Sequence, residues 1–65
     1  MNLSKAVEAM IERGWDAYEQ DGDSLIHFRL SLEQMNQKTY DRINRDLIEI
    51  GWNKSWGSVG KGFQK

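Results

Sequence analysis

The sequence predicts one small α+β domain over residues 1–65, with its elements in the order α-β-β-α-β and two amphipathic helices packed on a three-stranded sheet. Three observations indicate this fold class. Two segments repeat apolar residues at helical spacing, two alternating segments flank an Asp-Gly pair, and a Gly-Trp dipeptide follows each predicted helix. A chain of 65 residues has room for one such domain.

The first helix is expected over residues 3–13. Its apolar stripe is formed by Leu3, Val7, Met10 and Ile11. Asn2 or Ser4 is suited to the N-cap, because either side chain can accept a hydrogen bond from a free N–H of the first turn. Gly14 stands where a left-handed residue ends a helix, and Trp15 would then fold back over the last turn.

A β-hairpin is expected over residues 15–20 and 24–30, joined by Asp21-Gly22 as a two-residue type I′ turn. This register places Ala17 opposite Ile26. One face of the hairpin then carries Trp15, Ala17, Ile26, Phe28 and Leu30. The other face carries Tyr18, Leu25, His27 and Arg29.

The second helix is expected over residues 32–50, with Ser31 and Gln34 as its capping box. Its apolar stripe consists of Leu32, Met35, Thr39, Ile43, Leu47 and Ile50. A third strand is expected over residues 52–58. The remaining residues, 60–65, are glycine-rich, and we expect a mobile tail there.

The Gly-Trp dipeptide recurs at an offset of 37 residues, in Ile11-Glu12-Arg13-Gly14-Trp15 and Ile48-Glu49-Ile50-Gly51-Trp52. Both copies stand where a predicted helix ends. We interpret the repetition as the same helix-end chemistry used twice, in preference to an internal duplication.

The composition excludes several classes of protein. The net charge of −1 is that of neither a strongly basic nor a strongly acidic protein, and no apolar run reaches the length of a membrane span. The chain has no cysteine, which fits a cytoplasmic location and excludes disulfides and thiolate metal sites. We expect no cofactor, no metal and no membrane partner.

His27 is the only histidine, and the predicted register places Asp16 opposite it. Such a pair is more typical of a surface contact than of a catalytic base. Asp21 and Asp23 flank Gly22 but lack the rest of a calcium loop, so turn chemistry explains them better. We therefore predict no catalytic residues and no enzymatic activity.

Charge is distributed unevenly along the chain. Residues 1–33 carry a net charge of −4 and residues 34–65 a net charge of +3. Basic and aromatic residues alternate near the C-terminus, a pattern that can bind single-stranded nucleic acid through phosphates and stacked bases. The residues of this candidate site are Trp52, Lys54, Trp56 and Lys61.

A protein-binding surface is the other candidate. If both helices cover one face of the sheet, Tyr18, Leu25 and Trp56 are exposed together on the other face; if one helix covers each face, they are not. Tryptophan and tyrosine dominate the energetics of protein interfaces. The predicted contact residues are Tyr18, Leu25, Arg29, Tyr40, Trp52, Lys54 and Trp56.

Residues 4–29 resemble the start of the HicA-type toxins, through Gly14-Trp15 after a helix and through Gly22 and Ser24 near the following turn. The resemblance implies a small ribonuclease with a fold like that of double-stranded-RNA-binding domains. Leu25 follows Ser24 where that family has its histidine, and His27 comes two positions later. In size and style the chain also resembles small accessory proteins of phages and mobile elements, such as anti-CRISPR-type inhibitors.

These observations lead to a functional hypothesis. We expect a non-enzymatic protein-binding module, an inhibitor or adaptor of phage or mobile-element type, that occludes a host protein and is a monomer or a small homo-oligomer. The alternatives are a nucleic-acid-binding module that uses the C-terminal basic and aromatic residues, and a HicA-like ribonuclease.

Overall fold

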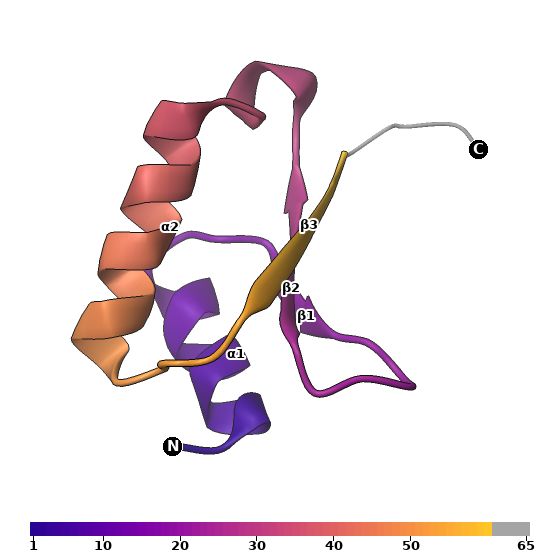
Figure 1. Ribbon diagram of the computed structural model, residues 1–65, viewed down its shortest axis with the longest axis vertical. Coiled ribbons are helices and arrows are strands. Elements are labelled where there is room, and N and C mark those ends of the chain that lie inside the picture. Colours follow the sequence, from indigo (N-terminus) through magenta and orange to yellow (C-terminus); the bar gives the residue numbers. More distant parts are fainter. Residues whose placement is uncertain (61–65) are drawn as a thin grey trace.

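The computed structural model describes residues 1–60 and confirms the α+β class and the element order. The elements are α1 (Leu3–Glu12), β1 (Ala17–Glu19), β2 (Ile26–Leu30), a short 3-10 helix η1 (Leu32–Gln34), α2 (Gln37–Ile50) and β3 (Trp56–Gly60) (Figure 1). The predicted mobile tail lies outside the described residues, apart from Gly60 at the end of β3.

The three strands form one mixed sheet in the order β1-β2-β3. β1 runs antiparallel to the central strand β2, and β3 runs parallel to it after the crossover through α2. Both helices cover the same face of this sheet (Figure 1). The alternative with one helix on each face is therefore wrong, and within residues 1–60 the second face of the sheet carries no helix.

The core lies between that sheet face and the two helices. Its buried side chains are Ala6, Val7 and Met10 from α1, Ala17, Ile26, Phe28 and Leu30 from the sheet, Ile43 and Leu47 from α2, and Trp52 from the loop before β3. The strand residues are those that the alternating pattern assigned to the apolar face of the hairpin. Trp15 from the same face packs against the cluster and is half-buried.

Both helices end in the same way. Gly14 and Gly51 adopt φ values of 95° and 96°, in the left-handed region that favours glycine. The N–H of Trp15 donates to the carbonyl of Met10, and the N–H of Trp52 donates to that of Leu47, at 3.0 and 2.9 Å. These bonds are those of the Schellman motif. The predicted repetition of helix-end chemistry is confirmed.

The hairpin register differs from the prediction by two residues. Ala17 pairs with Phe28, where we expected Ile26, and Tyr18 pairs with His27, where we expected Asp16. A type I′ turn needs positive φ at both central residues, and among the described non-glycine residues none has it. The strands are instead joined by the six-residue loop 20–25. A shift of two keeps every side chain on its predicted face.

The predicted helix over residues 32–50 is interrupted near its start. The capping box of Ser31 and Gln34 forms as expected, but it begins the 3-10 helix η1. The chain then leaves helical geometry at Met35, and the Asn36 side chain caps α2 by accepting from the N–H of Thr39. As a result Leu32 and Met35 are exposed and do not belong to the core.

The third strand begins later than predicted, at Trp56 rather than at residue 52. The Schellman end of α2 turns Trp52 back into the core, where only 4% of it is exposed. The chain therefore needs a short loop, residues 53–55, before it can join β2. The register with β2, in which Trp56 pairs with Ile26, then fixes which residues of β3 face the helices.

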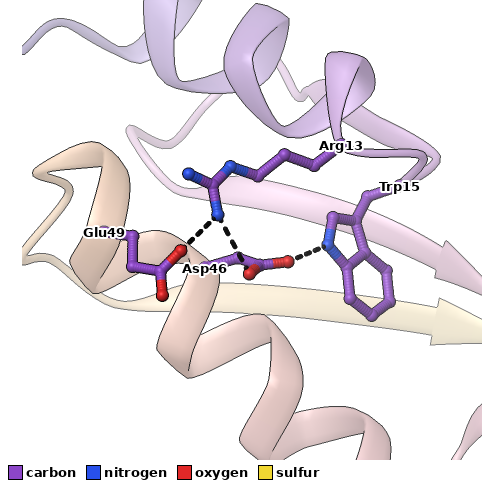
Figure 2. A network of polar contacts seen from close by, with 4 residues as sticks. All are labelled: Arg13, Trp15, Asp46 and Glu49. Carbon is purple, nitrogen blue, oxygen red and sulfur yellow. Dashed lines mark hydrogen bonds and ion pairs between the residues drawn. The ribbon is translucent and has the colours of Figure 1, made fainter.

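A polar network joins the ends of the two helices (Figure 2). The Arg13 guanidinium donates to Asp46 at 3.1 Å and to Glu49 at 2.7 Å. The second oxygen of Asp46 accepts a 2.8 Å hydrogen bond from the indole N–H of Trp15. The two carboxylates raise the pKa of Arg13 above its ordinary value. Asp46 thus connects α2 both to the end of α1 and to the first Gly-Trp turn.

Candidate functional site

The predicted contact residues do not share one surface. Tyr18 and Arg29 lie on the open sheet face, opposite the helices. Trp56 pairs with Ile26, whose side chain is in the core, so Trp56 faces the helix side. The expectation that Tyr18 and Trp56 share one surface is therefore wrong. Lys61 lies outside the described residues.

The hollow on the helix side, which we call the Trp56 groove, lies beside the end of α2 and the loop that leads to β3. Its volume is about 350 Å³. It is lined by Asn44, Leu47, Ile48, Trp52, Asn53, Lys54 and Trp56. Three of the predicted contact residues thus come together here, and Tyr40 is in contact with one of them. A smaller hollow of about 280 Å³ on α1 is lined mostly by charged and small side chains.

Trp56 is held in the groove by contacts on several sides. Its ring makes edge-to-face contacts with Phe28 and Tyr40, with centroid distances of 5.5 and 5.8 Å. Its indole N–H donates to the side-chain oxygen of Asn44 at 2.7 Å. The side chain is only half-buried, so part of the ring remains exposed. A tryptophan held in place from several sides loses little conformational entropy when a partner covers it.

Trp52 contributes to the groove wall from within the core. Because it is almost fully buried, its ring is not available as a surface contact in this conformation. Its indole nitrogen is buried and has no acceptor among the described residues. The Lys54 ammonium lies 5.6 Å from the centre of the ring, in cation–π geometry. The loop therefore places one fixed cation at the rim of the groove.

Ile48 was missed by the sequence analysis, although it is the most exposed large apolar residue at the groove. Its exposed fraction is 75%. It follows the core residue Leu47 and falls beside the predicted stripe of α2. The sequence signal that could have indicated Ile48 is an apolar residue just beside the apolar stripe of a helix. Asn44, four residues earlier, lies on the same side of the helix.

The basic residues of this half of the chain are largely free of carboxylate partners. Lys38, Arg42, Arg45 and Lys54 form no ion pair with the described part of the chain. The nearby acids are engaged elsewhere, because Asp46 binds Arg13 and Asp41 accepts from Gln37. The spacing of Lys38, Arg42 and Arg45 places them along one side of α2.

The open sheet face carries a row of stacked polar side chains. The Arg29 guanidinium lies 3.9 Å from the centre of the Tyr18 ring. The Tyr18 ring stacks on His27 at 5.3 Å. Asp16 lies 3.4 Å from Arg29 at one end of the row, and Asp23 lies 3.1 Å from His27 at the other. Since Arg29 and His27 each have an acid beside them, this row offers little attraction for a phosphate backbone.

Leu25, another predicted contact residue, lies in the loop just before β2 and is half-buried. Its backbone N–H donates to the Asp23 carboxylate at 3.0 Å. The leucine therefore helps to shape the loop that presents Asp23 to His27.

Both nitrogens of His27 face groups of the protein itself. Nε2 is within 3.2 Å of both oxygens of Asp23. Nδ1 lies over β3, 3.0 Å from the point where a Cβ on Gly57 would stand. Only 13% of the side chain is exposed. The glycine leaves room for the ring, and this packing holds the ring between Asp23 and β3, away from solvent.

The Asp23 carboxylate gives the stability of the domain a dependence on pH. Its pKa lies below the ordinary value of 3.8, mainly because it accepts the Leu25 N–H and also because it lies against His27. A carboxylate whose pKa is lower in the folded than in the unfolded protein stabilises the fold at pH values above its unfolded-state pKa. This stabilisation is lost as the pH falls through the folded-state pKa. The free energy of unfolding of the wild type should therefore fall with acidification more steeply than that of Asp23→Asn. Urea titrations at a series of decreasing pH values measure the free energy of unfolding of both proteins. A difference between the two free energies that stays constant with pH would contradict the expectation.

The described residues, 1–60, hold no cluster of three His, Cys, Asp or Glu side chains suited to a metal ion. Within the same residues, neither α1 nor α2 is long and apolar enough to cross a membrane. Comparisons with models of protein families, with curated proteins and with solved structures find no match for the chain.

Proposed function

We propose that this protein is a binding module that occludes a surface of a partner protein, and that the Trp56 groove is its contact site. The observation that carries the proposal is the fixed but partly exposed ring of Trp56 beside the exposed Ile48. Apolar side chains in this arrangement are costly to leave in water and gain most when a partner covers them.

The residue types of the groove support a protein partner. Interface hot spots are rich in tryptophan and are surrounded by polar groups that exclude water. Here Trp56 and Ile48 are flanked by Asn44 and Lys54. The contact of His27 Nε2 with Asp23 and the low exposure of the His27 side chain support a binding role over RNA cleavage.

The experiment is affinity capture from a lysate of the source cells, with and without nuclease, using the wild type and two variants. Ile48→Asp places a charge at the groove, and Leu32→Asp places the same charge on an exposed apolar residue of η1. We expect a stoichiometric protein to survive nuclease with the wild type and with Leu32→Asp. Ile48→Asp should weaken its binding by about 30-fold or more, the cost of losing a hot spot.

Two results would contradict this proposal. One is equal capture by both variants when circular dichroism shows that both are folded. The other is capture that disappears with nuclease. This second outcome would favour nucleic acid, for which the cations Lys38, Arg42, Arg45 and Lys54 are the supporting observation. Nucleic-acid binding would also weaken steeply with salt, because phosphate contacts release counterions.

A further inference from the structure

The two edges of the sheet differ in how they are protected. β1 has three residues and ends in Glu19, whose carboxylate accepts a hydrogen bond from Ser4 of α1. β3 has five residues, without a charge or a proline. Exposed edges are usually shielded by charged residues, prolines or very short strands. Within the described part of the chain, only β1 has such protection.

The unprotected edge begins at the Trp56 groove. Trp56 is the first residue of β3, and its ring reaches towards α2, where it meets Asn44 and Tyr40. In a strand added beside β3, successive side chains would alternate between the helix side and the open face. A side chain on the helix side near Trp56 would enter the groove beside Ile48.

Charge indicates which kind of segment fits. Lys54 stands two residues before β3 and lines the groove. On α2, Arg45 comes three residues before Ile48, on the same side of the helix, and has no ion-pair partner among residues 1–60. A segment with acidic side chains would complement these cations, whereas a basic segment would be repelled. A second copy of β3 brings no carboxylate of its own. Charge therefore favours a different, acidic chain over self-association through this edge.

We propose that an extended acidic segment of the partner protein adds to β3 as a fourth strand and seats one apolar side chain in the Trp56 groove. This inference rests on the proposed function and names the chemistry of its partner. Backbone hydrogen bonds to the free edge would supply affinity, and the groove would supply specificity, as in other cases of strand addition.

The test uses seven-residue peptides, acetylated and amidated, that alternate glutamate with valine or isoleucine. A matched peptide carries lysine in place of glutamate. Two further peptides carry N-methyl groups on the apolar residues or on the glutamates. Because alternate N–H groups of a strand point to the same side, only one of these two methylated peptides loses the hydrogen bonds to β3. The readout is the ¹⁵N spectrum of the full chain.

We expect the glutamate peptide to shift the indole signal of Trp56 and the amides of residues 56–60, and to leave the Trp15 indole unchanged. It should bind about tenfold more tightly than the lysine peptide, since several exposed ion pairs each contribute modestly. One methylated peptide should lose binding about tenfold or more, and the other should retain it.

Different failures separate the inference from the proposed function. If the glutamate peptide shifts none of these signals, or if the two methylated peptides bind equally, strand addition is wrong. In that case, capture of the partner protein can still depend on Ile48. The groove then remains the contact site, although no strand adds to β3. If the lysine peptide binds as tightly as the glutamate peptide, the acidic chemistry is wrong. If single-stranded oligonucleotide shifts the Trp56 signal and the glutamate peptide does not, the partner is nucleic acid and the inference fails.

Discussion

Replacing Phe28 with alanine should remove a large part of the free energy of unfolding and give the largest loss of stability of the variants considered. Phe28 is fully buried at the centre of β2 and makes edge-to-face contacts with Trp15 and Trp56. Such a truncation costs about 3–5 kcal/mol. A domain of 65 residues has a free energy of unfolding of only about 3–10 kcal/mol, at the usual stability per residue. No disulfide offsets the loss.

The control is Tyr18→Ala on the other side of the sheet. It removes an aromatic ring of similar size that is only half-buried, on the face without helices. Urea unfolding followed by tryptophan fluorescence measures both variants. We expect Tyr18→Ala to remain folded with a smaller loss. Equal losses for the two variants would contradict a core confined to one face of the sheet.

Replacing Asp46 with alanine should give the second largest loss of stability, about 1–3 kcal/mol, because it leaves a partly buried donor without its acceptor. Asp46 is the acceptor of the Trp15 indole N–H and also binds Arg13 (Figure 2). Its side chain is only 15% exposed, so water replaces it poorly.

Glu49→Ala is the matched variant, because Glu49 binds the same guanidinium from an exposed position on the same helix. An exposed ion pair contributes about 0–1 kcal/mol, so this variant should stay close to the wild type. Thermal unfolding followed by circular dichroism compares them. A larger loss for Glu49→Ala than for Asp46→Ala would show that the ion pair, not the indole hydrogen bond, dominates the network.

The elements of this fold could be predicted because short-range physics determines them. Gly14 and Gly51 mark the two helix ends, since few other residues adopt their left-handed geometry. The alternating pattern assigned Ile26 and Phe28 to the buried face. Both kinds of signal act within a few residues, so they can be recognised directly in the sequence.

The errors arose where two local signals competed. Asp21-Gly22 favoured a tight turn, but the Asp23 carboxylate stabilises a longer loop by accepting from Leu25. Ser31 began a helix as predicted, but Asn36 capped a second one five residues later. The packing of the whole domain decides which of two competing local structures forms. This packing cannot be derived from the short-range pattern of the sequence.

The candidate site was predictable in part. Trp56 and Lys54 were predicted and lie together, and Tyr18 was predicted but lies on the opposite face. The separation follows from the pairing of β3 with β2, since Trp56 stands beside the core residue Ile26 and therefore shares its face. Trp52 was predicted as a contact, but the helix end directs it into the core.

The three tryptophans provide the most direct test of the central claim, that the Trp56 groove is the contact site. Their indole N–H groups have different environments: Trp15 donates to Asp46, Trp56 donates to Asn44, and the Trp52 nitrogen is buried. A ¹⁵N spectrum of the full chain, recorded with and without the nuclease-resistant captured protein, reports on all three. The account predicts that the Trp56 signal moves most while the Trp15 signal stays unchanged. A Trp56 signal that does not move, with shifts confined to Tyr18 and His27, would place the contact on the open sheet face and contradict the account.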